Sequence, residues 1–264
     1  MIFEPHPREF FRPDDPPFRL TLSAERADAL AALGVAIVYE LPFDAVFSHM
    51  SAEQFMSDIL HAGLGAKHLA CGQDFAFGHR KGGDTAFLAV RAEALGMGFT
   101  AVPAVADASG PISATRIRRA LQDGYPERAA ALLGRPWAIR AVVAHGDKRG
   151  RTIGFPTANL PLGRYLEPAR GVYAVTIRLP DGSVKQGAAN IGRRPTVNEG
   201  PESRLEVNIF DWAGDIYGAE ISVALHAFIR PEQRFSGLEE LQARIAVDAA
   251  EARRILDQAG LPSA

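Results

Sequence analysis

Residues 146–159, which read GDKRGRTIGFPTAN, combine glycines, cations and neutral oxygen side chains in one short segment. The glycines are Gly146, Gly150 and Gly154, and the cations are Lys148, Arg149 and Arg151. Glycines allow tight turns and close approach of the backbone to a ligand, and cations between them suit a phosphate. The segment is not a Walker A loop, because no Gly-Lys-Ser/Thr follows and a Phe-Pro pair argues against a helix there. It predicts a phosphate-binding loop, with a basic surface turn as the alternative.

Two neutral oxygen ligands, Thr157 and Asn159, follow Pro156 at a spacing of two residues. In an extended chain this spacing puts both side chains on one face. Magnesium prefers oxygen ligands, and it usually keeps several waters while it binds substrate phosphates. The sequence therefore predicts that these two residues hold a hydrated Mg²⁺ beside a nucleotide.

The elements that must position these residues show strand-like alternation after residue 136. Apolar residues alternate strictly at Leu205, Val207 and Ile209, and Asp181-Gly182 is a hairpin signal between two apolar runs. Glu206 then lies on the other face of its strand, where a carboxylate is usually just solvated. The expected elements are strands at 137–145, 171–179, 183–191, 204–212 and 220–229, followed by a helix near 237–257. This order predicts a small antiparallel barrel with a C-terminal helix.

The first half instead alternates helical and strand-like segments. Apolar residues at three- and four-residue spacing predict helices at about 22–33, 51–62 and 84–95. The short apolar runs 35–39, 68–71 and 99–105, with a further possible strand at Met1, are typical of strands buried on both faces, so we expect a doubly wound parallel sheet. The predicted domains are 1–122 and 137–264, joined by a compact connector at 123–136 that contains a short helix ending at Gly134.

Ligands of such sheets bind at the carboxyl ends of the strands, which singles out three loops. Residues 3–7, Phe-Glu-Pro-His-Pro, follow the possible strand that begins at Met1. Asp74 lies in the loop after the strand at 68–71. Ser113 and Thr115 open a helix that also carries Arg118, and two hydroxyls, a helix N-terminus and a cation are suited to an anion. The alternative is that Ser113 simply caps a basic helix.

Composition limits the class of protein. With 264 residues, 47% apolar and 23% charged, the chain has the balance of a soluble globular protein of two domains. A net charge of −2 gives no support to nonspecific binding of nucleic acid or an anionic membrane. No run of eighteen apolar residues and no signal segment occur, and the single Cys71 fits a reducing cytoplasm without disulfides.

Residues 154–159, Gly-Phe-Pro-Thr-Ala-Asn, resemble the signature of the riboflavin kinase family, and residues 146–151 stand where that family carries its nucleotide-binding turn. Residues 205–211, Leu-Glu-Val-Asn-Ile-Phe-Asp, match the family's segment that holds the catalytic base. The resemblance extends over essentially all of the chain to the bifunctional bacterial enzyme, in which riboflavin kinase is joined to FAD synthetase. It implies a Greek-key barrel that makes FMN from riboflavin and ATP with Mg²⁺, and it makes Glu206 the catalytic base. The nucleotide-binding residues so implied are Gly146, Lys148, Gly150, Arg151, Gly154, Phe155, Pro156, Thr157 and Asn159.

The same resemblance makes the first half a Rossmann-like nucleotidyltransferase in which Asp74, Ser113, Thr115 and Arg118 contact ATP or FMN. The family's first strand and helix, with the motif Gly-x-Phe-Asp-Gly-x-His-x-Gly-His, have no counterpart in this sequence. Either the start codon is assigned too far downstream or the adenylyltransferase half is degraded. We therefore expect the chain as written to make little or no FAD.

The function expected from the sequence is that of a riboflavin kinase in the cytoplasm. The enzymatic alternative is the full bifunctional activity, with FMN and ATP converted to FAD and diphosphate. An alternative of another class is a non-catalytic module that binds flavin or nucleotide in regulation. Formation of FMN from riboflavin and Mg·ATP separates that module from an enzyme.

Overall fold

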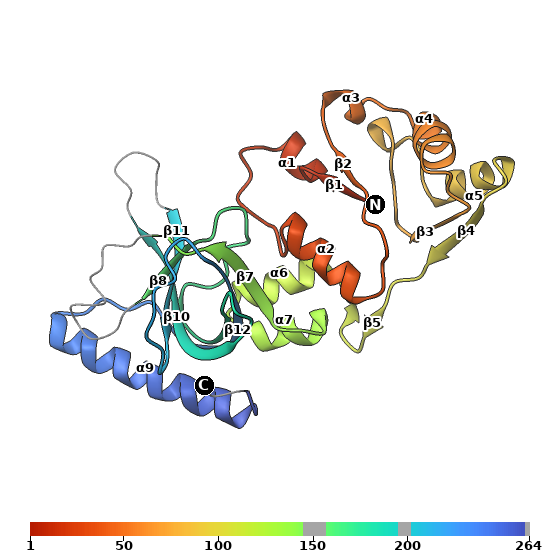
Figure 1. Ribbon diagram of the computed structural model, residues 1–264. Helices are drawn as coiled ribbons and strands as arrows, with labels where there is room; N and C mark the ends of the chain where they lie inside the picture. Colours follow the sequence, from red (N-terminus) through yellow and green to blue (C-terminus); the bar gives the residue numbers. More distant parts are fainter. Residues whose placement is uncertain (145–156, 195–201, 262–264) are drawn as a thin grey trace. The chain divides into compact units, whose positions relative to one another are not determined.

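The computed structural model describes residues 1–144, 157–194 and 202–261, and the chain divides into two compact units (Figure 1). The first unit comprises Met1–Asp15 and Ala29–Ile112, and the second comprises Pro16–Asp28 and Ser113–Ala264. Residues 16–28 and 113–122, which the sequence boundary at residue 122 places in the first domain, therefore pack with the second unit. Among the described residues, no helix is both long enough and apolar enough to cross a membrane.

The first unit contains parallel strand pairs with helices between them. The pairs are β1 (Ile2–Glu4) with β2 (Glu40–Pro42) and β3 (His68–Gly72) with β4 (Gly98–Val102), and a short hairpin joins β5 (Ala106–Asp107) to β6 (Gly110–Pro111). The helical segments are α1 (Pro7–Phe11), α2 (Ser23–Ala32), which both units share, α3 (Ala45–Ser48), α4 (Ala52–Gln54), the π-helix η1 (Phe55–Gly63), the 3₁₀ turn η2 (His79–Lys81) and α5 (Thr85–Ala94). The predicted α/β alternation is confirmed, although the described strands form separate two-stranded sheets.

One predicted strand of this unit is wrong. Residues 35–39 have no strand structure, and Ile37 in their middle is 63% exposed. The strand instead begins at Glu40, where the chain runs beside β1. Apolar, β-branched composition favours a strand only where a neighbouring strand supplies hydrogen bonds and cover, and residues 35–38 have no strand partner in the described part of the chain.

Local signals explain the helix boundaries of the first unit. Ser51 and Gln54 form a capping box, because each side chain accepts a hydrogen bond from the backbone N–H of the other residue. The side chain of Asp84 caps α5 by accepting from the N–H of Phe87. The π-helix was not predicted, since its apolar spacing resembles that of an α-helix. Its residues Phe55, Met56 and Leu60 pack with Leu88 and Ala92 of α5 in the core of this unit.

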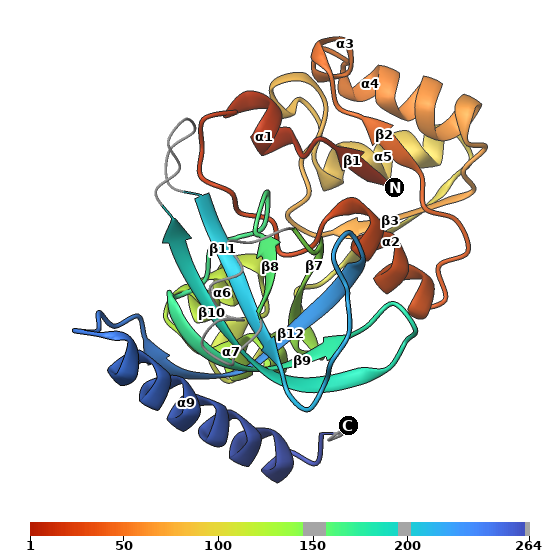
Figure 2. The same ribbon diagram turned by 60° about the vertical axis from the view of Figure 1, so that its left-hand side comes forward.

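The second unit is a six-stranded antiparallel sheet that nearly closes into a barrel (Figure 2). Its strands are β7 (Trp137–Val142), β8 (Ala158–Pro161), β9 (Gly171–Arg178), β10 (Val184–Arg194), β11 (Glu202–Ile209) and β12 (Glu220–Pro231), in the spatial order β7-β12-β9-β10-β11-β8. A bridge between Ala144 and Asn159 joins the two edges. The five expected strands and the barrel are confirmed. The sixth strand, β8, is the extended segment that carries Asn159.

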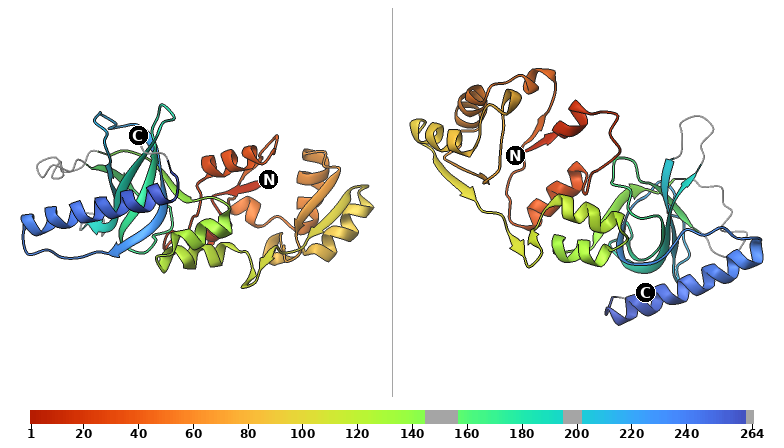
Figure 3. Two further views of the ribbon diagram at one scale, coloured as in Figure 1. Left: turned by 90° about the horizontal axis from the view of Figure 1, so that it is seen from below. Right: turned by 180° about the vertical axis from the view of Figure 1, so that it is seen from behind.

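Helices cover the barrel on the outside. Helices α6 (Ala114–Gln122) and α7 (Pro126–Leu133) add Ile117, Leu121 and Ala129 to the barrel core. The long helix α9 (Leu238–Gln258) lies along the outer face of β9, β10 and β12 (Figures 1 and 3). Both the connector helix and the C-terminal helix were expected, and Gly134 ends α7 in the left-handed region as predicted.

A buried ion pair anchors α9 to the sheet. The carboxylate of Asp248 on α9 is 3% exposed, and it accepts a hydrogen bond of 2.7 Å from Nη2 of Arg230 on β12. Arg244, one helical turn earlier, donates to the same carboxylate from Nε at 3.1 Å. Breaking such a buried pair would leave an uncompensated charge inside the protein, so the contact fixes where the helix docks.

Candidate functional site

The catalytic candidate Glu206 and the metal-ligand candidate Asn159 are direct partners across β11 and β8. The carbonyl of Asn159 accepts a 2.8 Å hydrogen bond from the N–H of Ala144, so it points away from β11. Glu206 and Asn159 are therefore a non-hydrogen-bonded pair, in which Cα atoms lie about 4.5 Å apart and side chains are close. Two residues separated by 47 positions, by the difference of their numbers, thus meet on one face of the sheet.

That face is the outside of the barrel. The flanking residues Leu160, Leu205 and Val207 are 0% exposed and belong to the barrel core. Because side chains alternate along a strand, Asn159 and Glu206 point the opposite way. Asn159 is nevertheless only 6% exposed, and its Oδ1 has no hydrogen-bond partner among the residues that the structure describes. A buried polar atom without a partner is costly and calls for a functional explanation.

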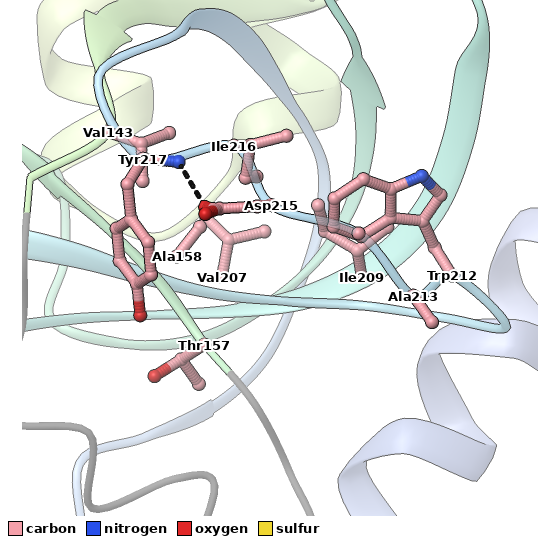
Figure 4. A pocket seen from close by; sticks show the side chains of 11 residues that line it. Val143, Thr157, Ala158, Val207, Ile209, Trp212, Ala213, Asp215, Ile216 and Tyr217 are labelled. Atoms are coloured by element: carbon pink, nitrogen blue, oxygen red, sulfur yellow. Dashed lines mark hydrogen bonds between the residues drawn. The ribbon is translucent and has the colours of Figure 1, made fainter.

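A cavity of about 330 Å³ opens beside the third candidate, Thr157, which is half-buried and directly precedes β8. Figure 4 shows Thr157 and the ring of Tyr217 on one side of the cavity and the indole of Trp212 on the other. The lining residues are Val143, Thr157, Ala158, Val207, Ile209, Trp212, Ala213, Gly214, Asp215, Ile216 and Tyr217. The cavity therefore has apolar walls, two aromatic rings and a hydroxyl at its edge.

The loop that supplies Trp212 and Tyr217 is held at both ends. It begins at Asp211, whose φ of 49° turns the chain out of β11, and whose carboxylate accepts from Nη2 of Arg253 on α9 at 3.1 Å. Near its other end, the carboxylate of Asp215 accepts a 3.0 Å hydrogen bond from the N–H of Tyr217 (Figure 4). The C-terminal helix thus helps to place the loop that lines the cavity.

The predicted phosphate loop lies outside the described residues, which end at Ala144 and resume at Thr157. The positions concerned are Gly146, Lys148, Gly150, Arg151, Gly154, Phe155 and Pro156. The two flanking residues are close in space, because Ala144 pairs with Asn159 and Thr157 is two positions before Asn159. The described residues on either side of this loop, Ala144 and Thr157, therefore lie next to the Asn159–Glu206 pair.

A flavin ring needs flat apolar walls, which Tyr173, Phe210 or Trp212 could supply. Tyr173 is 1% exposed in the barrel core, and its hydroxyl donates to the carbonyl of Ala169. Phe210 is 4% exposed, and the centre of its ring lies 4.1 Å from Cζ of the Arg253 guanidinium. Both rings are used in packing, and Trp212 alone of these described candidates lines the cavity.

A further polar residue lies beside Glu206 in the sheet. Asn190 on β10 pairs with Glu206 from the side opposite Asn159. Its strand was expected, but only the register between β10 and β11 brings Asn190 to Glu206. The described residues contain no cluster of three or more His, Cys, Asp or Glu side chains that could hold a metal ion.

The other candidates divide between the two units. Asp74 is exposed after β3 in the first unit, whereas Ser113, Thr115 and Arg118 belong to α6 and its cap in the second. Ser113 accepts from the N–H of Arg116 at 3.3 Å, which is the helix cap named as the alternative interpretation. Binding of ATP or FMN by these residues stays a prediction.

The side chain of Arg118 has structural contacts in the second unit. Its Nε donates to the backbone carbonyl of Phe18 at 2.8 Å, and its guanidinium lies 5.3 Å from the centre of the Phe18 ring.

In the first unit, the structure brings together two histidines that are far apart in sequence. The rings of His49 and His79 stack with centres 5.0 Å apart.

Comparison with known proteins matches each half of the chain to a protein family. The family model for riboflavin kinase matches residues 133–256, and the model for FAD synthetase matches residues 1–116. A protein of Escherichia coli K12 described as a bifunctional riboflavin kinase/FMN adenylyltransferase is 45% identical over 253 residues, which are 96% of this chain and 80% of that protein. A protein of Pseudomonas fluorescens with the same description is 42% identical over 257 residues, covering 97% and 81%.

A solved structure is also similar over most of the chain. It is a crystal structure from Streptococcus pneumoniae described as a macrolide-efflux protein, with a TM-score of 0.84 and 35% sequence identity. The match covers 96% of this chain and 82% of that one. The described fold of this chain is therefore shared with an experimentally determined structure.

Proposed function

The chain belongs to the family of bifunctional riboflavin kinase/FMN adenylyltransferases, and we propose that its barrel transfers the γ-phosphate of ATP to the terminal ribityl hydroxyl of riboflavin, giving FMN and ADP. The observation that supports this most directly is the pairing of Glu206 with Asn159 on one face of the sheet. A carboxylate next to a buried amide oxygen that has no hydrogen-bond partner among the described residues combines a proton acceptor with a ligand for the cation that accompanies ATP.

Glu206 acts as the general base. As the ribityl oxygen attacks the γ-phosphorus, the O–H bond breaks and its proton passes to the Glu206 carboxylate. A new O–P bond forms, the bond to the β-phosphate oxygen breaks, and ADP leaves. A positioned carboxylate typically contributes about 10² to 10⁴ in rate to such a step, and positioning of the reactants contributes most of the rest.

Thr157 and Asn159 are the proposed ligands of Mg²⁺. Both supply neutral oxygens, and Oδ1 of Asn159 is buried with no other partner in the described part of the chain, which fits a hard cation that prefers oxygen. When bound with ATP, the ion would neutralise charge on the phosphates. The protein's own part is to hold the two oxygens beside Glu206, so that the phosphates and the base share one place.

We assign the cavity beside Thr157 to the adenine ring of ATP. Thr157 lines the cavity, and Asn159, two residues further along, pairs with Glu206. A nucleotide can therefore lie with its base between Trp212 and Tyr217 and its phosphates along the start of β8. A Trp212→Ala variant should then raise KM for ATP more than KM for riboflavin. The opposite pattern would assign the cavity to the flavin ring.

FMN formation from riboflavin and Mg·ATP tests the kinase proposal. Glu206→Gln keeps the shape of the side chain but removes the base, so turnover should fall by about 10² or more while flavin binding persists. Glu220→Gln is the matched control, because Glu220 is a half-exposed carboxylate of β12 whose ion pair with Arg140 lies at the surface. Unchanged FMN formation by Glu206→Gln would reject the assignment.

A second activity, FMN adenylyltransferase, is favoured by the FAD synthetase match over residues 1–116. Product analysis with riboflavin, ATP and Mg²⁺ distinguishes the possibilities. FMN alone would show the kinase activity by itself, conversion onward to FAD would show both activities, and binding without product would indicate a regulatory module. We place the reaction in the cytoplasm, since Cys71 has no second cysteine with which to form a disulfide.

A further inference from the structure

Glu206 has an asparagine on each side of it in the sheet. Asn159 lies opposite on β8, and Asn190 lies opposite on β10. The N–H of Phe210 bonds the carbonyl of Gln186 at 2.9 Å, so that pair is a hydrogen-bonded one. Hydrogen-bonded pairs alternate along an antiparallel ladder, so Glu206 and Asn190 are also such a pair, with Cα atoms about 5.5 Å apart. The three side chains therefore form one row on the outer face.

The surroundings of Asn190 differ from those of Asn159. Asn190 is half-buried, and the next residue on its face of the strand is Gly192, which has no side chain to cover the amide. A Cβ placed on Gly192 would lie 3.3 Å from Nδ2 of Asn190 and 2.3 Å from Oε1 of Glu232. The space above Gly192 is thus bordered by an amide and a carboxylate, which are groups that hydrogen-bond hydroxyls.

If the proposed function is correct, the phosphate donor, ATP, lies on one side of the row, and the phosphate acceptor, riboflavin, lies on the other. Thr157 lines the cavity, and Asn159, the proposed ligand of the cation that accompanies ATP, follows two residues later on β8, so ATP approaches from β8. The hydroxyl that loses its proton to Glu206 must then come from the other side, which is the side of Asn190. The acceptor is a polyol, whose next hydroxyl follows one carbon away and comes within reach of a residue adjacent to Glu206.

We propose that Asn190 binds the acceptor: its amide hydrogen-bonds a secondary hydroxyl of the ribityl chain and so holds the terminal hydroxyl in front of Glu206. An amide both donates and accepts, which matches the two roles of a hydroxyl group. Loss of one such hydrogen bond should cost roughly 3- to 10-fold in kcat/KM for riboflavin. Asn190 is then a specificity-determining residue for a polyhydroxylated acceptor.

The test compares riboflavin with a flavin that carries a hydroxypentyl chain, which keeps the terminal hydroxyl and lacks the secondary ones. The wild type should prefer riboflavin, and Asn190→Ala should lose most of that preference while its KM for ATP stays unchanged. Asn190→Ser, which retains a hydroxyl, should recover part of it. Gly192→Ala, which crowds the amide, should raise KM for riboflavin. Ser222→Ala is the control and should behave as wild type. Ser222 is a polar residue of β12 that pairs with Arg178 of β9 and not with β10.

The outcomes separate this inference from the proposed function. If Asn190→Ala lowers kcat/KM equally for both flavins, or changes KM for ATP instead, Asn190 does not recognise the acceptor and the inference is wrong. The kinase proposal would then still stand, provided that the wild type makes FMN and Glu206→Gln does not. A wild type that makes no FMN would overturn both. Thermal unfolding of each variant shows whether a loss of activity comes from a loss of fold.

Discussion

Replacing Asn159 with leucine should make the barrel more stable and the enzyme inactive. Asn159 is 6% exposed, and its Oδ1 has no hydrogen-bond partner within the described ranges. Leaving a buried polar group without a partner costs about 1–3 kcal/mol, whereas an apolar side chain of similar shape has no such cost. Allowing for contacts that the amide nitrogen loses, we expect the free energy of unfolding to rise by about 1 kcal/mol. For a unit of this size, that is roughly 2–4 °C in Tm.

Tryptophan fluorescence can follow this transition, because both tryptophans, Trp137 and Trp212, belong to the second unit. The wild type should gain further stability when Mg·ATP is added, by about 2.7 kcal/mol at a hundred times Kd, and Asn159→Leu should gain little. Asn208→Leu is the control, since Asn208 is half-buried on the same face and has an interaction partner, so leucine should not stabilise there. A fall of 1 kcal/mol or more in Asn159→Leu would show that the amide supports the fold, and would refute the reasoning.

Three other predictions follow from the second unit. Thr157→Ala should raise KM for Mg·ATP with little effect on KM for riboflavin, and identical nucleotide kinetics would remove Thr157 from the site. Asp248→Asn leaves Arg230 without its buried carboxylate and should lower the free energy of unfolding by about 3 kcal/mol in denaturant titration; a loss below 1 kcal/mol would contradict this. Burial lowers the pKa of His226, so the unfolded state binds the proton more readily, and stability should fall as pH drops below about 6.5. His226→Gln should lose less stability between pH 7.5 and 5.5 than the wild type, and equal losses would exclude His226 as the cause.

Much of the second unit could be predicted because its signals are local. Alternation at Leu205, Val207 and Ile209 is enough to assign a half-buried strand and to put Glu206 on the other face, and all three residues are in the barrel core. The short helix that ends at Gly134 and the hairpin at Asp181-Gly182 likewise depend on nearby residues. The run 35–39 shows the limit of this approach, because a strand also needs a partner that composition does not supply.

Sequence by itself determined that Glu206 faces outward from β11, and it predicts which segment binds a phosphate and a metal. Tertiary structure alone decided that Asn159, Glu206 and Asn190 form one row, because the register of three strands joins positions far apart in the chain. It also decided that Oδ1 of Asn159 is buried with no hydrogen-bond partner within residues 1–144, 157–194 and 202–261, since burial depends on what packs around an atom. Periodicity fixes the direction of a side chain, but pairing between strands fixes its neighbours, and the proposed chemistry depends on those neighbours.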